Sequence, residues 1–264
     1  MQGKERKALT PHLFSQNALE KMTKDQLIEE IQSLQKQLRQ NAAVNEELKA
    51  FTYVASHDLK SPLRGLRSLT KWVIEDCEKI IPLEPKGHLQ RMLDKLDKME
   101  ALLDGLLQYS RVGHTQVTLE QVSMKEMISR ILSLLPVPPD LTIKVAPTLP
   151  ILLASPIMVQ HVFQSLIDNA IKYRKPNEPA LIEITAQDKG KYYEFLIKDN
   201  GLGIERAYHD KIFRMFQRLH NYDNIEGAGI GLALVKKILE TEKGSIRVVS
   251  ELGKGSEFIV SWPK

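Results

Sequence analysis

The sequence has a single cysteine, Cys77, among its 264 residues, which excludes an internal disulfide and any metal site built from several thiolates. It lacks an apolar run near the roughly 20 residues that a membrane-spanning helix needs, and its first residues are too polar to begin a signal peptide. Charge of one sign is not concentrated anywhere: 37 Lys and Arg and 33 Asp and Glu are spread along the chain, so nucleic-acid binding is not indicated. These absences predict a soluble, cytoplasmic protein.

Hydrophobic residues make up 42% of the chain, enough for a core in one or two compact domains. Near the N-terminus, the apolar residues Leu27, Ile31, Leu34 and Leu38 alternate steps of four and three, which is typical of a short coiled coil. We therefore expect an N-terminal tail and a coiled-coil linker over residues 1–45. One amphipathic helix packed on its own chain is the alternative interpretation.

Residues 46–113 predict a helical hairpin. The first helix is expected to run through His57 to about Ile81, where prolines interrupt it, and Pro62 should kink it. The second helix carries an apolar stripe at helical spacing, formed by Leu89, Met92, Leu93, Leu96, Met99, Leu103, Leu106 and Leu107. Two antiparallel helices cannot cover such stripes alone, so we expect a homodimer in which two hairpins form a four-helix bundle.

The pattern changes over residues 114–264, where helical segments alternate with short β-branched runs at 141–145, 181–185, 195–198, 245–249 and 258–261. This alternation predicts a separate α/β sandwich. Ser155 and Pro156 make a good helix start, because Ser can cap free amides and Pro needs no donor at the first position. The helix should continue to about Tyr173.

His57 and Asp58 form the first motif of chemical interest. A neutral imidazole is a competent nucleophile toward phosphorus at neutral pH. Asp58 can act as the adjacent base, because it can accept a hydrogen bond from the other ring nitrogen and take up its proton. By itself the pair can also be explained as polar residues on a helix surface.

The predicted helix ending near Tyr173 carries the second motif. Ser165, Asn169, Lys172 and Tyr173 lie along one side of it, since residues three and four apart are neighbours on a helix. The Asn169 carbonyl is a hard oxygen ligand suited to Mg²⁺, Lys172 can meet a phosphate, and the Tyr173 ring can stack on adenine. An amphipathic helix with a polar edge is the alternative.

Two glycine motifs follow. Asp199, Gly201 and Gly203 come after an apolar run, so a carboxylate at the end of a strand can accept the adenine amino hydrogen where glycines let the chain approach the base. Gly227, Gly229 and Gly231 stand before and at the start of an amphipathic helix, where free amides and the helix dipole bind phosphate. The Asp199 motif alone is also a common turn, and residues 218–226 are interpreted either as a lid or as a plain loop.

Taken in this order, the motifs make residues 46–264 resemble the transmitter region of two-component sensor histidine kinases, with an acceptor segment most like that of phytochrome-type sensors. The resemblance implies a dimeric phosphoacceptor hairpin followed by a Bergerat-type ATP-binding sandwich. It also implies that Mg²⁺ and ATP support autophosphorylation of His57, followed by transfer to an Asp of a response-regulator receiver domain.

Residue by residue, the same resemblance assigns His57 as the phosphoacceptor, Asp58 as the adjacent acid and Asn169 as the magnesium ligand. It places Lys172, Tyr173, Asp199, Gly201, Gly203, Arg218, Gly227, Gly229, Gly231 and Ser256 in the ATP site, and Phe213 and Phe216 in an aromatic box. Two positions depart from the family pattern. Ser165 stands where a second Asn is usual, and Ser61 stands where Thr or Asn often supports phosphatase activity.

Two other functions compete with a kinase. A nucleotide-gated scaffold would bind ATP and a partner without chemistry, which the intact His57, Asp58 and Asn169 disfavour. A gyrase-like ATPase is disfavoured by Ser165, because related ATPases hold a Glu base at that position.

Overall fold

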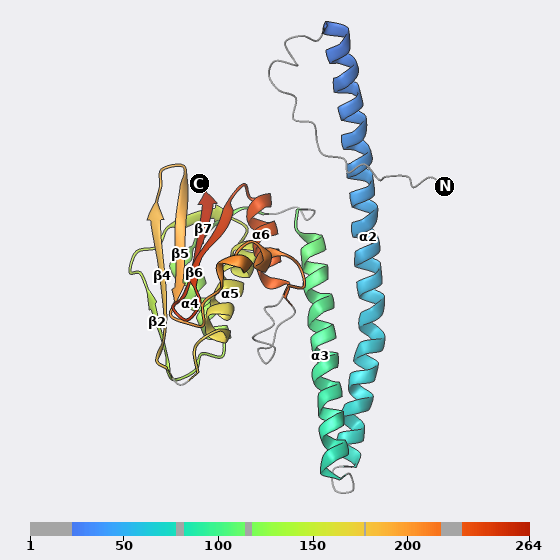
Figure 1. Cartoon of the computed structure of the whole chain (residues 1–264), viewed down its shortest axis with the longest axis vertical. Helices are drawn as coiled ribbons and strands as arrows, with labels where there is room; N and C mark the ends of the chain where they lie inside the picture. The colour runs from blue at the N-terminus through green and yellow to red at the C-terminus, as the bar shows by residue number, and fades with distance from the viewer. Residues whose placement is uncertain (1–22, 78–81, 114–117, 177, 218–228) are drawn as a thin grey trace, which may run out of the picture. The chain divides into compact units, whose positions relative to one another are not determined.

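The computed structural model describes residues 23–77, 82–113, 118–176, 178–217 and 229–264 (Figure 1). The chain divides into two units, residues 1–51 and 52–264. In the first unit the described residues after Thr23 belong to helix α2 (Lys24–Asp76), which also supplies the first residues of the second unit. The predicted seam residues Ile31, Leu34 and Leu38 are exposed on α2. That exposure disagrees with a helix packed on its own chain, and the coiled coil stays a prediction.

The hairpin consists of the second part of α2 and helix α3 (Leu83–Arg111). Helix α2 ends at Asp76, before the expected Ile81, and residues 78–81 lie outside the described part. Pro62 lies inside α2 as expected. Ion pairs cross from α2 to α3 at three levels, Lys60 to Asp104, Arg64 to Glu100 and Arg67 to Asp97. Their order shows that the two helices are antiparallel, as the sequence predicts.

The sandwich contains a five-stranded sheet in the order β2-β4-β5-β7-β6. Its strands are β2 (Leu141–Val145), β4 (Ala180–Asp188), β5 (Tyr192–Asp199), β6 (Ser245–Glu251) and β7 (Gly255–Pro263). Strands β2 and β4 pair in parallel and the other neighbours pair antiparallel. All five runs predicted as strands lie in this sheet. A separate two-stranded sheet, β1 (Glu120–Ser123) with β3 (Ile151–Ala154), was not predicted.

Helices α4 (Met124–Leu134), α5 (Pro156–Lys172) and α6 (Gly231–Thr241) lie on one side of the five-stranded sheet (Figure 1). The short 3₁₀ helices η1 (Arg206–Tyr208) and η2 (Lys211–Phe213) follow β5. Phe163 of α5 and Phe195 of β5 are fully buried and meet edge to face at 5.0 Å between ring centroids. This packing fixes α5 on the sheet and turns its polar edge outward.

The start of α5 corrects one prediction. Ser155 occupies the position before the helix, and Pro156 is its first residue, but the Ser155 side chain makes no capping hydrogen bond. The capping serine is Ser123, which accepts from the Glu126 amide at 3.5 Å at the start of α4. Among the described helices, none combines the length and apolar character needed to cross a bilayer.

Candidate functional site

Two predicted site residues on the polar edge of helix α5, Lys172 and Asn169, differ in their contacts. Lys172 Nζ lies 2.5 Å from Asp168 Oδ2, so its ammonium is held by an acid one turn earlier. The Asn169 side chain, in contrast, has no hydrogen-bond or ion-pair partner among the described residues. The Asn169 amide oxygen is therefore available as a ligand atom, whereas Lys172 would have to leave Asp168 to contact a phosphate.

The Asp199 carboxylate ends β5 and organises the turn that follows. Its Oδ1 accepts from the amides of Gly201 at 2.8 Å and Ser256 at 3.2 Å. Burial raises the pKa of Asp199 to about 6, against which the two amide hydrogen bonds act in the opposite direction. Ser256, at the start of β7, is itself buried. Asp199 and Ser256, predicted from distant motifs, therefore meet in the fold.

The glycines around Asp199 are places where main chain is pressed against main chain. A Cβ added at Gly201 would lie 2.4 Å from the Tyr173 carbonyl oxygen, and one at Gly203 would lie 2.0 Å from that of Glu251. Gly203 also has a φ of +70°, which disfavours side chains. The Leu202 amide donates to the Tyr173 carbonyl at 2.9 Å. The end of α5 and the Asp199 turn are thus in direct contact and form one continuous surface.

The start of α6 contacts the same surface at Ser165 of α5. A Cβ added at Gly231 would lie 2.6 Å from Ser165 Oγ, so this departure from the family pattern faces the phosphate-side glycines. Gly229 has a φ of +68°, and its carbonyl accepts from the Phe216 amide at 2.8 Å. The first amides of α6, which a helix leaves unpaired, begin at this turn. The structure therefore brings three of the predicted motifs together.

Other predicted site residues have more varied positions. Phe213 packs partly against the core, whereas Phe216 is exposed and has a φ of +61°. Arg218 and Gly227 lie outside the described residues. The sequence analysis missed Ser250, whose hydroxyl accepts from the Ile204 amide at 2.8 Å and donates to the Gly255 carbonyl at 2.8 Å. A serine within a strand carries no local signal for that bridging role.

His57 lies on α2, where it is exposed, and its Nδ1 is 3.2 Å from Asp58 Oδ1. This contact is the pairing that the sequence predicts. Because the Asp58 contact uses Nδ1, the Nε2 atom is left as the nitrogen that can attack. Ser61 is exposed on the next turn. The acceptor motif is therefore accessible from solvent and already has its acid in place.

Two family models match the chain. Residues 47–115 match the His Kinase A (phospho-acceptor) domain, and residues 154–264 match the histidine kinase-, DNA gyrase B-, and HSP90-like ATPase. The first match contains His57 and the second contains Asn169, Asp199, Gly231 and Ser256. The two matches therefore cover the residues discussed above.

Known proteins give the same result. The chain is 38% identical over 220 residues to cyanobacterial phytochrome B of Nostoc sp., which covers 81% of this chain and 29% of that protein. It is 30% identical over 249 residues to the phytochrome-like protein Cph1 of Synechocystis sp., covering 93% and 33%. The chain thus spans about a third of the length of these relatives.

Two solved structures share the fold. Full-length ShkA in complex with AMPPNP has a TM-score of 0.61 at 22% identity, covering 80% of this chain and 45% of that one. The Acinetobacter baumannii histidine kinase AdeS has a TM-score of 0.53 at 20% identity, covering 78% and 97%. At these identities the likeness shows the fold alone, a helical hairpin followed by an α/β ATPase domain.

Proposed function

The chain belongs to the histidine kinases, and on that premise we propose that it catalyses phosphoryl transfer from ATP to His57 and then to an Asp of a response regulator. The observation that carries the proposal is the His57 and Asp58 pair, exposed and hydrogen-bonded within the segment that matches a phospho-acceptor domain. His57 Nε2 forms the new N–P bond while the bond from the γ-phosphorus to the ADP oxygen breaks. Asp58 keeps the ring oriented and takes up the proton of Nδ1.

The sandwich would bind the nucleotide at the surface formed by the end of α5, the Asp199 turn and the start of α6. Both amide hydrogen bonds to Asp199 go to Oδ1, so Oδ2 accepts the adenine amino hydrogen. The amides at Gly229 and Gly231 hold phosphate oxygens at the start of α6. We place Tyr173 against the base and Ser256 behind Asp199. Lys172, Arg218 and Gly227 are assigned to the phosphates from the family pattern.

Magnesium fits this site through one protein ligand. Within the described part of the chain no cluster of three His, Cys, Asp or Glu residues could hold a metal alone. Mg²⁺ usually keeps several waters and binds one or two protein oxygens together with substrate phosphates, and the Asn169 amide oxygen has no competing partner among the residues that the structure describes. When bound, the ion would neutralise charge on the transferred phosphoryl group.

We propose that the hairpin forms a homodimer through its apolar face. An open groove of about 330 Å³ is lined by apolar residues: Leu59, Pro62, Leu63, Leu66, Met99, Leu102 and Leu103. Leu59 and Leu66, which line it, are more than half exposed. A second hairpin would cover this face as a four-helix bundle. We propose that the reaction takes place in the cytoplasm, where ATP and a response regulator would be available.

Incubation with γ-labelled ATP and Mg²⁺ tests the kinase proposal. We expect acid-labile, base-stable label on the wild-type chain and none on His57→Ala, because the N–P bond forms only at that imidazole. His88→Ala removes another exposed histidine of the hairpin and should leave labelling unchanged. Bound nucleotide without label would instead indicate a scaffold, and release of free phosphate without label would indicate an ATPase.

A further inference from the structure

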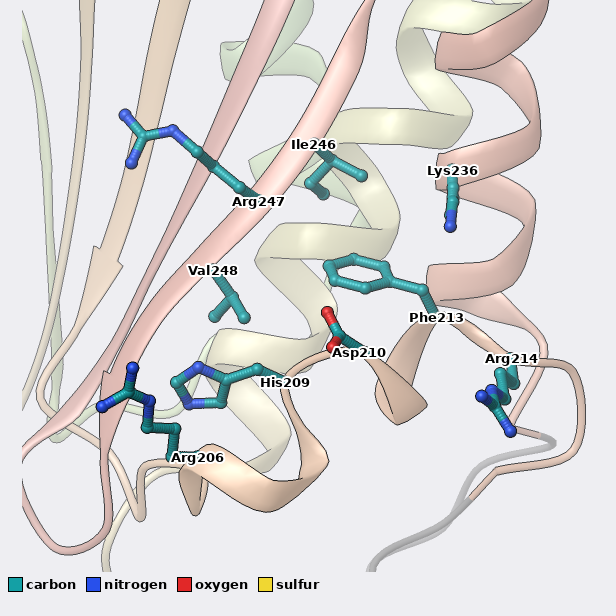
Figure 2. Close-up of a pocket in the computed structure, with 9 residues that line it drawn as sticks. All are labelled: Arg206, His209, Asp210, Phe213, Arg214, Lys236, Ile246, Arg247 and Val248. Atoms are coloured by element: carbon teal, nitrogen blue, oxygen red, sulfur yellow. The ribbon is translucent and has the colours of Figure 1, made fainter. Parts of the chain in front are cut away.

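A second hollow lies on the sandwich, apart from Asn169, Asp199 and Ser256. It has a volume of about 600 Å³, within the roughly 300–1,000 Å³ typical of ligand pockets. It is formed by η1, η2, α6 and β6, and it is lined by Arg206, His209, Asp210, Phe213, Arg214, Lys236, Ile246, Arg247 and Val248 (Figure 2). No residue of the proposed ATP site except the aromatic-box Phe213 belongs to it.

The floor of this pocket is apolar and held in place. Ile246 and Val248 are on the helix-facing side of β6, and both pack against the core together with Phe213. Figure 2 shows the Phe213 ring between Lys236 of α6 and Ile246 of β6. Beside Val248, His209 is fixed through a contact of 3.1 Å between its Nε2 and the Ile204 carbonyl oxygen. The pocket therefore offers a preformed apolar surface.

The rim of the pocket carries an excess of positive charge. Arg206 and Arg214 are exposed, and neither guanidinium has a hydrogen-bond or ion-pair partner within the part of the chain that the structure describes. Among the described residues, Lys236 pairs only with Glu240 of its own helix, at a long distance of 3.9 Å. Arg247 lies on the other side of β6 and reaches Glu194 at 3.5 Å. Asp210 is the one acid among the lining residues.

We propose that this pocket docks an acidic segment of a partner protein. An apolar side chain of the segment would pack on Phe213, Ile246 and Val248, and flanking carboxylates would pair with Arg206 and Arg214. Arg206 and Arg214 lie on opposite sides of the pocket, with His209, Asp210 and Phe213 between them (Figure 2), an arrangement that suits an extended peptide better than one compact anion. Charge complementarity selects such a partner.

The chain's own N-terminal residues do not supply this segment. Residues 1–22 contain Lys4, Arg6, Lys7 and Lys21 against Glu5 and Glu20, so they share the positive sign of the pocket. The occupant is therefore expected on another protein. The proposal does not depend on phosphoryl transfer, because none of the reacting groups touches the pocket.

A fluorescent peptide with Leu and Phe between two pairs of Glu is the probe, and its anisotropy with the full chain is the measurement. We expect saturable, salt-sensitive binding that weakens about tenfold in the Arg206→Glu, Arg214→Glu double variant, because each exposed ion pair contributes only modestly to affinity. Lys191→Glu, an exposed charge reversal in the turn between β4 and β5, is the matched control and should bind as the wild type does.

Four further ligands sharpen the test. A peptide with Gln in place of Glu, and one with Ser in place of Leu and Phe, should each bind at least about tenfold more weakly, since each lacks one half of the recognition. Equal binding of the Gln peptide would overturn the proposal, as would full competition by citrate, which would reveal a small-anion site. Binding to anionic lipid vesicles that is lost in the double variant, without peptide binding, would overturn it in favour of a membrane surface.

Discussion

The hairpin and the sandwich bury their apolar residues to very different extents. In the sandwich, Phe163, Phe195 and Trp262 are at most 2% exposed, whereas in the hairpin Leu66 and Trp72 are 52% and 58% exposed. Because its core is closed, the sandwich should be stable without a second copy of the chain. The hairpin leaves its apolar face open, so its full stability should depend on a second copy.

Of the substitutions that test this comparison, Phe163→Ala should have the largest effect, a loss of stability in the sandwich. Removing a fully buried ring that meets Phe195 leaves a cavity, and we expect a loss of about 3–5 kcal/mol in the unfolding free energy of the sandwich. Urea unfolding followed by fluorescence of Trp262, in a Trp72→Phe background, reports on the sandwich alone. Met99→Ala on the exposed hairpin face is the comparison and should shift that transition by less than about 0.5 kcal/mol.

Leu66→Glu tests the open apolar face of the hairpin, the other half of this comparison. A carboxylate on the open face would be buried unpaired in the bundle, so we expect the dimer dissociation constant to rise at least about 100-fold. Sedimentation equilibrium measures the change, while nucleotide affinity of the sandwich should stay the same. Ser68→Glu places the same charge at an exposed polar position of α2. If both variants dissociate equally, the dimer does not use this face.

Asp199 predicts a pH dependence confined to the sandwich. Its pKa of about 6 means that the carboxylate, which the adenine amino group needs as acceptor, is progressively protonated below that pH. ATP affinity should fall up to about tenfold per pH unit below 6, as titration calorimetry can measure. Because the folded chain holds this proton more tightly than the unfolded one, the stability contributed by Asp199 is greatest below its ordinary pKa of 3.8 and declines as pH rises toward 6.

Asp199→Asn supplies the control for this titration. The amide oxygen can still accept from Gly201 and Ser256, but the side chain no longer titrates. Binding should be weak and independent of pH between 5 and 7. A pH dependence that persisted in this variant would assign the effect to another group.

The ion pairs across the hairpin should give the smallest effect. Arg67 Nε lies 2.6 Å from Asp97 Oδ1, but both side chains are half exposed, so the pair should contribute only about 0.2–1 kcal/mol. A double-mutant cycle with Arg67→Ala and Asp97→Ala measures the coupling by thermal unfolding of the hairpin. A coupling above about 2 kcal/mol would contradict the screening expected at this exposure.

Local patterns in the sequence account for much of this structure. The β-branched runs predict the five strands of the main sheet, and the glycine motifs predict Asp199 at a strand end and Gly231 at a helix start. The strands β1 and β3 were missed because four residues are too few to show a period. Ser155 stands at the predicted position before α5, but residue type alone does not show whether its side chain makes the capping hydrogen bond.

Contacts between distant segments could not be predicted. Nothing local indicates that Gly231 faces Ser165, or that Ser250 bridges the main chain at Ile204 and Gly255. The pairing of Lys172 with Asp168 was accessible in principle, because the two residues are four apart on one helix. It was missed because Lys172 was assigned to a phosphate.

The close approach of main chain to main chain around Asp199 limits how this protein can change. At Gly201, Gly203 and Gly255 even a methyl group would collide with a carbonyl oxygen at 2.4, 2.0 and 2.1 Å. The fold therefore tolerates almost no substitution at these three glycines, even under selection for a different nucleotide. Adaptation of the base site would have to proceed through the carboxylate and through side chains outside the turn, and even a change as small as glycine to alanine would produce conditional or null alleles there.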